Sequence, residues 1–91
     1  MNEASPFTLP VIHLNGTGAN SLQQEYRNAR ISLNQAIEKF HQTTCHPRDF
    51  YPVEGSWEKA RKEREEMRDS LNKVLAFLEA WEYHAHSHRK V

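Results

Sequence analysis

The sequence predicts an all-α fold: an antiparallel two-helix hairpin with an extended N-terminal arm, assembled into a homo-oligomer. Two apolar stripes, whose members alternate by three and four positions, predict the two helices. A turn rich in glycine and asparagine precedes the first stripe, and a loop with two prolines separates the stripes. The longer stripe comprises Trp57, Ala60, Arg64, Met67, Leu71, Val74, Leu78 and Trp81; the shorter comprises Leu22, Tyr26, Ala29, Leu33, Ala36 or Ile37, and Phe40.

The chain is expected to form one helical domain over residues 1–91. Proline and glycine positions divide it into an extended arm with a glycine turn, a first helix, a loop, a second helix and a tail. These parts cover residues 1–19, 20–43, 44–55, 56–86 and 87–91.

Short local patterns predict how the elements begin. The apolar run from Val11 to Leu14 is expected either as a short strand or as an arm laid on a neighbouring chain. Ser21 with Gln24 forms a capping box for the first helix, unless Asn20 caps it instead. Ser56 is expected to cap the second helix.

Composition narrows the functional classes. Twelve basic and twelve acidic residues cancel, so no diffuse positive field for duplex nucleic acid is expected. No apolar run is long enough to span a membrane, and no signal peptide is visible. The lone Cys45 forms no disulfide within the chain. A soluble protein of the reducing cytoplasm fits these features best.

The size of the chain and its surplus apolar residues predict self-association. A lone hairpin of 91 residues buries little surface, and short chains are often stabilised by association. Leu75 and Phe77 flank the second stripe on opposite sides, and Ile31 points away from the first. One partner helix does not cover all three, so a neighbouring chain or its arm is expected to do so.

The glycine turn, residues Asn15, Gly16, Thr17 and Gly18, is the first candidate for ligand binding. Glycines let successive backbone N–H groups turn inward, and the following helix start adds free N–H groups and partial positive charge. This combination suits a phosphate or a carboxylate. The alternative is an ordinary turn that leads the arm into the helix.

The loop and one stripe position supply further candidates. Arg48 offers a planar fork for an anion, and Tyr51 or Phe50 offers a ring for stacking. Alternatively, the two rings close the end of the hairpin beside Phe40 and Trp57, and Arg48 fixes the turn. A hairpin holds this loop and the glycine turn at opposite ends, so a pocket shared by both requires a second chain packed head to tail.

Arg64 interrupts the second stripe, and its guanidinium needs an anion or carbonyl groups as partners. It is expected either to reach solvent or an acidic neighbour, or to contact a ligand phosphate.

Metal binding and catalysis are weakly indicated. His84 and His88 share a helix face, with His86 between them, but the sequence shows no third ligand, and such histidines also suit the helix dipole. His41, Cys45 and the adjacent His46 form another partial set. We therefore predict no metal, no cofactor and no catalytic residue.

The order Val-Ile-His-Leu-Asn-Gly-Thr-Gly, a helix beginning Leu-Gln-Gln-Glu-Tyr, and an Arg-Asp-Phe-Tyr loop resemble a group of small phage-encoded proteins over residues 11–83. The predicted shape is also similar to the oligomeric helical hairpins by which phages sequester cyclic nucleotide messengers of bacterial immunity. The resemblance implies binding without turnover between protomers in the host cytosol. It implies that Asn15, Gly16, Thr17 and Gly18 hold phosphate, that Arg48 assists, and that Tyr51 or Tyr26 stacks on a base.

Two functions are therefore expected from the sequence. The first is a phage anti-defence protein that sequesters a nucleotide-derived signalling molecule as a homo-oligomer. The alternative is a helical interaction module that docks on and inhibits a host or phage protein. In neither case do we expect the chain to act as an enzyme.

Overall fold

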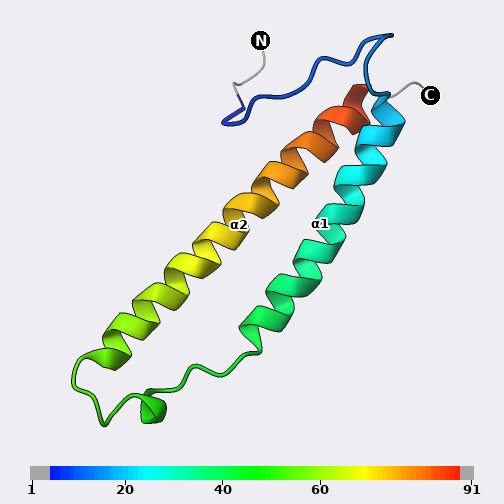
Figure 1. Ribbon diagram of the computed structural model, residues 1–91. Helices are drawn as coiled ribbons and strands as arrows, with labels where there is room; N and C mark the ends of the chain where they lie inside the picture. The colour runs from blue at the N-terminus through cyan, green and yellow to red at the C-terminus, as the bar shows by residue number, and fades with distance from the viewer. Residues whose placement is uncertain (1–4, 89–91) are drawn as a thin grey trace.

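The structure is a computed structural model that describes residues 5–88. Helix α1 spans Ala19–His41, the short 3-10 helix η1 spans Pro47–Asp49, and helix α2 spans Ser56–His88. The two long helices run antiparallel, with η1 in the connecting loop (Figure 1). Residues 5–88 contain no strand, so the all-α prediction is confirmed and the strand alternative for residues 11–14 is wrong. The expected tail falls mostly outside the described residues.

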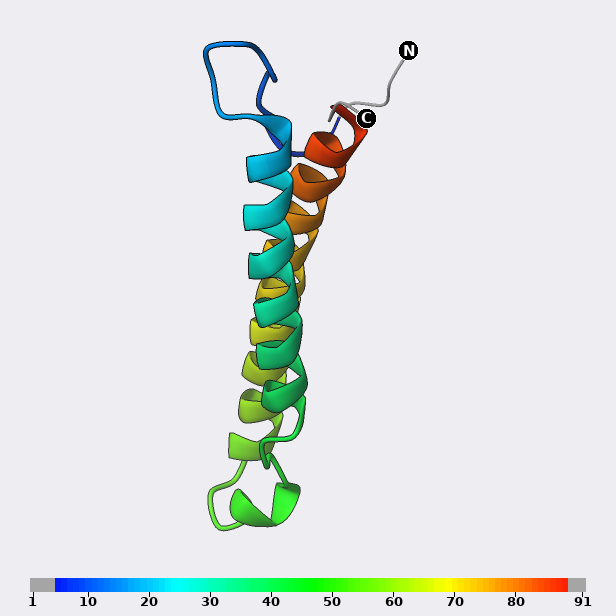
Figure 2. The ribbon, with the colours of Figure 1, turned by 90° about the vertical axis from the view of Figure 1, so that its right-hand side faces the viewer.

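The hairpin is a long, thin layer. Its principal extents are 61 × 26 × 19 Å. After a quarter turn one helix lies behind the other, so the molecule is a single layer of two helices (Figure 2). Only Ala19, Ile37 and Ala85 are buried among the hydrophobic residues described. A chain with so small a core has little hydrophobic free energy to offset the entropy of folding.

Aromatic contacts fix the antiparallel register of the helices. Tyr26 of α1 stacks on Trp81 of α2, with ring centroids 4.9 Å apart and planes inclined by 16°. The same tyrosine ring lies 6.4 Å from the ring of Phe77. Antiparallel pairing of the two predicted stripes places Leu22 and Tyr26 near Leu78 and Trp81, and these contacts confirm it for Tyr26 and Trp81. The buried indole N–H of Trp81 has no hydrogen-bond acceptor within residues 5–88, which costs about 1–3 kcal/mol.

The predicted stripes are correct in part. On α1, Ile37 and not Ala36 faces the partner helix, and Ala29 is exposed, whereas the neighbouring Arg30 is half-buried. On α2, Met67 and Val74 remain 54% and 49% exposed. A stripe that repeats every seven residues drifts around a straight helix, because a helix has 3.6 residues per turn whereas the repeat averages 3.5.

The second helix begins at Ser56 as predicted, but the caps of both helices differ from those predicted. Gly18 is the N-cap of α1, and no side chain caps that helix, so neither the Ser21 box nor Asn20 acts as predicted. Ser56 lies inside α2, where its hydroxyl group donates toward the carbonyls of Phe50 and Val53, at 2.9 and 2.8 Å. The first helical bond, from the N–H of Lys59, instead ends on the carbonyl of Gly55. Gly55 has φ = 80°, a conformation that favours glycine.

The N-terminal arm, residues 5–14, folds back over the end where α1 begins and α2 ends (Figure 1). The ring of Phe7 meets the ring of Phe77 edge to face, at 5.3 Å between centroids. His84 Nε2 donates to the carbonyl of Pro10 at 2.7 Å. The arm thus covers Phe77 of its own chain, whereas a neighbouring chain or that chain's arm was expected to cover it.

We predict that Phe7→Ala releases the arm, because Phe7 supplies its aromatic contact with α2. Limited proteolysis should cleave residues 5–14 of this variant several times faster than in the wild type. The control, Val11→Ala, removes a side chain that is 79% exposed and should leave cleavage unchanged. Equal rates for wild type and Phe7→Ala would contradict this seating of the arm.

Candidate functional site

The glycine turn leads into a helix start with free backbone donors. The N–H of Gly16 donates to the carbonyl of His13 at 3.2 Å, which closes the turn. The first bond of α1 runs from the N–H of Leu22 to the carbonyl of Gly18. The N–H groups of residues 19–21 therefore have no intrahelical acceptor, and the helix dipole places partial positive charge there.

A hollow of about 560 Å³ opens beside this helix start. Gly16 and Gly18 line it, whereas Asn15 and Thr17, the other two predicted residues, do not. Its polar lining includes His13, Asn20, Ser21 and His88. Among residues 5–88 the lining contains imidazole, amide and hydroxyl groups and no lysine or arginine, so these residues offer hydrogen bonds more than charge.

Tyr26 uses its ring within the chain. The Trp81 ring stacks on it, and the Phe77 ring lies beside it. Tyr26 is half-buried in this aromatic group and does not line the hollow at the glycine turn. A base stacked on its face would have to displace Trp81.

Arg48 and Tyr51 lie at the opposite end of the hairpin from the glycine turn (Figure 1). The backbone N–H of Arg48 donates to His46 Nδ1 at 3.1 Å, and its side chain is exposed. Tyr51 is 80% exposed, whereas Phe50 packs on Trp57 at 5.8 Å between ring centroids. Phe50 thus closes the end of the hairpin, and one chain does not unite the two predicted binding regions.

Arg64 binds the carboxyl end of α1. Its guanidinium donates to the carbonyls of Phe40 and Thr43, at 3.1 and 3.0 Å, and to the hydroxyl oxygen of Thr43 at 3.0 Å. The guanidinium carbon lies 4.7 Å from the centre of the Phe40 ring. A cation near the last carbonyls of a helix also complements its dipole. Arg64 therefore ties the two helices together through carbonyl groups.

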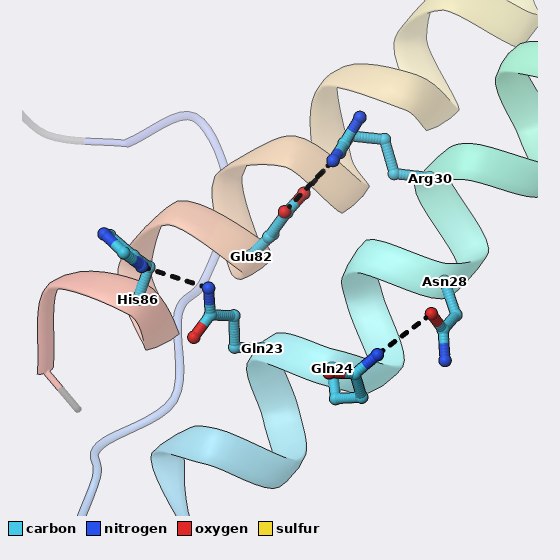
Figure 3. A network of polar contacts seen from close by, with 6 residues as sticks. All are labelled: Gln23, Gln24, Asn28, Arg30, Glu82 and His86. Carbon is cyan, nitrogen blue, oxygen red and sulfur yellow. Dashed lines mark hydrogen bonds and ion pairs between the residues drawn. The ribbon is translucent and has the colours of Figure 1, made fainter. Parts of the chain in front are cut away.

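Sequence reasoning missed the polar face of the hairpin, which carries interhelical hydrogen bonds (Figure 3). Arg30 of α1 forms a two-pronged ion pair with Glu82 of α2, in which Nη2 donates to Oε2 at 3.2 Å. The hydrogen bond to Glu82 raises the pKa of Arg30 above its ordinary value. One heptad earlier, the amide of Gln23 donates to His86 Nδ1 at 3.0 Å. In the sequence, Gln23 and Arg30 are seven positions apart, which places both on one side of α1 and could have indicated this polar face.

The other face of the hairpin carries exposed apolar side chains beside polar ones such as Ser70, and it was also missed. We call Ala29, Ala36, Met67 and Val74 the open face, since all four are exposed. Ala29 and Ala36 follow Tyr26 by three and ten positions, and Val74 and Met67 precede Phe77 by three and ten. Helical spacing therefore places these four on the side of the helices that carries the Tyr26–Phe77 contact. Val74 of the open face lies about one helical turn from Phe77, which the arm contacts.

The histidines near the end of α2 make hydrogen bonds within the chain. Besides the bond from His84 to Pro10, His88 Nδ1 donates to the carbonyl of His84 at 2.8 Å. No group of three potential metal ligands occurs within residues 5–88.

Comparisons with protein-family models, with curated proteins and with solved structures found no match. Neither described helix combines the length and the apolar character that a membrane crossing requires.

We predict that Arg64→Leu lowers the stability by about 1–3 kcal/mol, because the carbonyls at the end of α1 lose a charged donor. Thermal or denaturant unfolding measures the loss. The control is Arg61→Leu, which removes an exposed pair with Glu58 at 2.9 Å and should leave the stability nearly unchanged, because solvent screens that pair. A leucine variant as stable as the wild type would contradict this role and favour a ligand contact.

Proposed function

We propose that the chain is a helical interaction module that works by binding another protein chain along its open face, without turnover. The single observation that carries the proposal is the exposure of Met67 and Val74 within a stripe that otherwise packs between the helices. Burial of such side chains supplies about 25 cal/mol per Å² of apolar area removed from water.

The two faces of the layer differ in a way that supports this proposal. On the polar face, Arg30 and Glu82 satisfy each other's charge. On the open face, Ala29, Ala36, Met67 and Val74 are all exposed and carry no polar group that could be satisfied within the chain. Exposed apolar side chains grouped on one side of a molecule are typical of protein–protein contacts.

We predict that Val74→Asp abolishes association, because a partner would bury the new carboxylate without a counter-charge. Light scattering after size-exclusion chromatography measures the mass of the particle. The matched control is Asn72→Asp, which adds the same charge to the same helix at an exposed position off the open face. Association that survives Val74→Asp, or a wild type that associates with no chain, would refute the proposed function.

A small anionic ligand at the glycine turn is a second candidate function. It is favoured by the hollow of about 560 Å³ beside the uncapped start of α1. Free N–H groups at a helix start bind phosphate and carboxylate groups. Sequestration of a nucleotide-derived signal would use this hollow, with Arg48 and Tyr51 contributing only from a second chain.

We predict that Gly16→Ala weakens such binding, since the new Cβ would lie 2.9 Å from His13 Nε2 and displace that ring. Gly18→Ala is the control, because no atom lies within 4 Å of its new Cβ. Thermal shift assays with inorganic phosphate and with cyclic mono- and dinucleotides measure binding. If none of these anions raises the melting temperature of the wild type, this second function is wrong.

A further inference from the structure

We infer that the occupant of the open face is a second copy of this chain, placed so that α1 of each copy lies over α2 of the other. This inference rests on the proposed function and names the partner. The product is a bundle of four helices in which both arms lie at the same end.

A second copy is favoured over a different partner protein because the hairpin must be stabilised at all times. Within residues 5–88 the buried hydrophobic residues are Ala19, Ile37 and Ala85, too small a core for a chain of this length to be stable without support. A copy of the chain is the one partner present whenever the chain is made. Its formal net charge of +0 removes the long-range repulsion that opposes self-association.

The sizes of the four side chains fix the pairing. The register of Tyr26 with Phe77, and of Phe40 with Arg64, places Ala29 level with Val74 and Ala36 level with Met67. When α1 lies over α2 of the second copy, each alanine therefore meets a larger side chain. Each of the two helix pairs across the interface then brings small side chains against large ones, so the distance between the layers is the same at both pairs, as close packing requires. The opposite arrangement, α1 over α1, pairs alanine with alanine and methionine with valine, and it leaves the gap uneven.

Helix direction supports the same arrangement. With α1 over α2 of the other copy, every helix runs antiparallel to both of its neighbours, so the helix dipoles oppose one another. A standard interface takes roughly 800 Å² from each partner, about half of the 61 by 26 Å outline of the layer, so the contact extends beyond the four side chains of the open face. The arm on Phe77 lies beside this surface and leaves Met67 and Val74 free.

Disulfide formation between two single-cysteine variants tests the arrangement. Both variants carry Cys45→Ser, which removes the natural thiol. One variant adds Ala29→Cys and the other adds Val74→Cys, so a mixed disulfide joins different chains only. The matched control replaces Ala29→Cys with Arg27→Cys, an exposed position on the same helix but off the open face. The full-length chains are mixed under mild oxidation, and the masses of the products are measured by intact mass spectrometry.

We expect the Ala29→Cys and Val74→Cys mixture to give the mixed dimer in at least about tenfold higher yield than the control, since a disulfide requires Cα atoms roughly 4.4–6.8 Å apart. If Ala29→Cys instead links with an Ala36→Cys variant, the copies pack α1 over α1 and the arrangement is wrong. If the wild type is monomeric and Val74→Asp abolishes capture of a different protein, the second copy is wrong and the proposed function stands. If neither association exists, both are wrong.

Discussion

The limited packing capacity of a two-helix layer is the constraint on which this structure depends. Each helix buries one stripe against the other, and both faces of the layer remain open to solvent. The consequence is visible in the burial pattern, because among the hydrophobic residues of 5–88 only Ala19, Ile37 and Ala85 are buried. The chain meets this constraint differently on its two faces. The polar face carries satisfied hydrogen bonds, whereas the other face combines an intramolecular arm with the apolar open face.

Polar groups specify how the two helices align. Arg64 binds the last carbonyls of α1, and Arg30 pairs with Glu82 near the other end. A shift of one helix by one turn would separate both sets of partners and leave charged groups unpaired. Tyr26 stacked on Trp81 gives the same register from the apolar side. The hairpin therefore has one defined alignment in spite of its small core, and that alignment sets the geometry of the open face.

The helices and their antiparallel order were predictable from apolar periodicity, and so was the contact between Tyr26 and Trp81. The helix caps were not, because Gly18 and Gly55 occupy the positions where polar side chains were expected. Of the four residues of the predicted glycine site, Gly16 and Gly18 line a hollow, and Asn15 and Thr17 do not. Periodicity did not show that Arg30 would replace Ala29 in the packed stripe, since both positions fit a step of three or four. That one-residue difference decides which side of α1 is polar and which is open.

The central claim is that this hairpin is stable because a second chain covers its open face. Thermal unfolding measured over a hundredfold range of protein concentration tests the claim most directly, since binding that favours the folded state makes the melting temperature depend on concentration. We predict that the melting temperature of the wild type rises steadily with concentration. A melting temperature that is constant over the whole range would show that the chain is stable alone and would contradict the account.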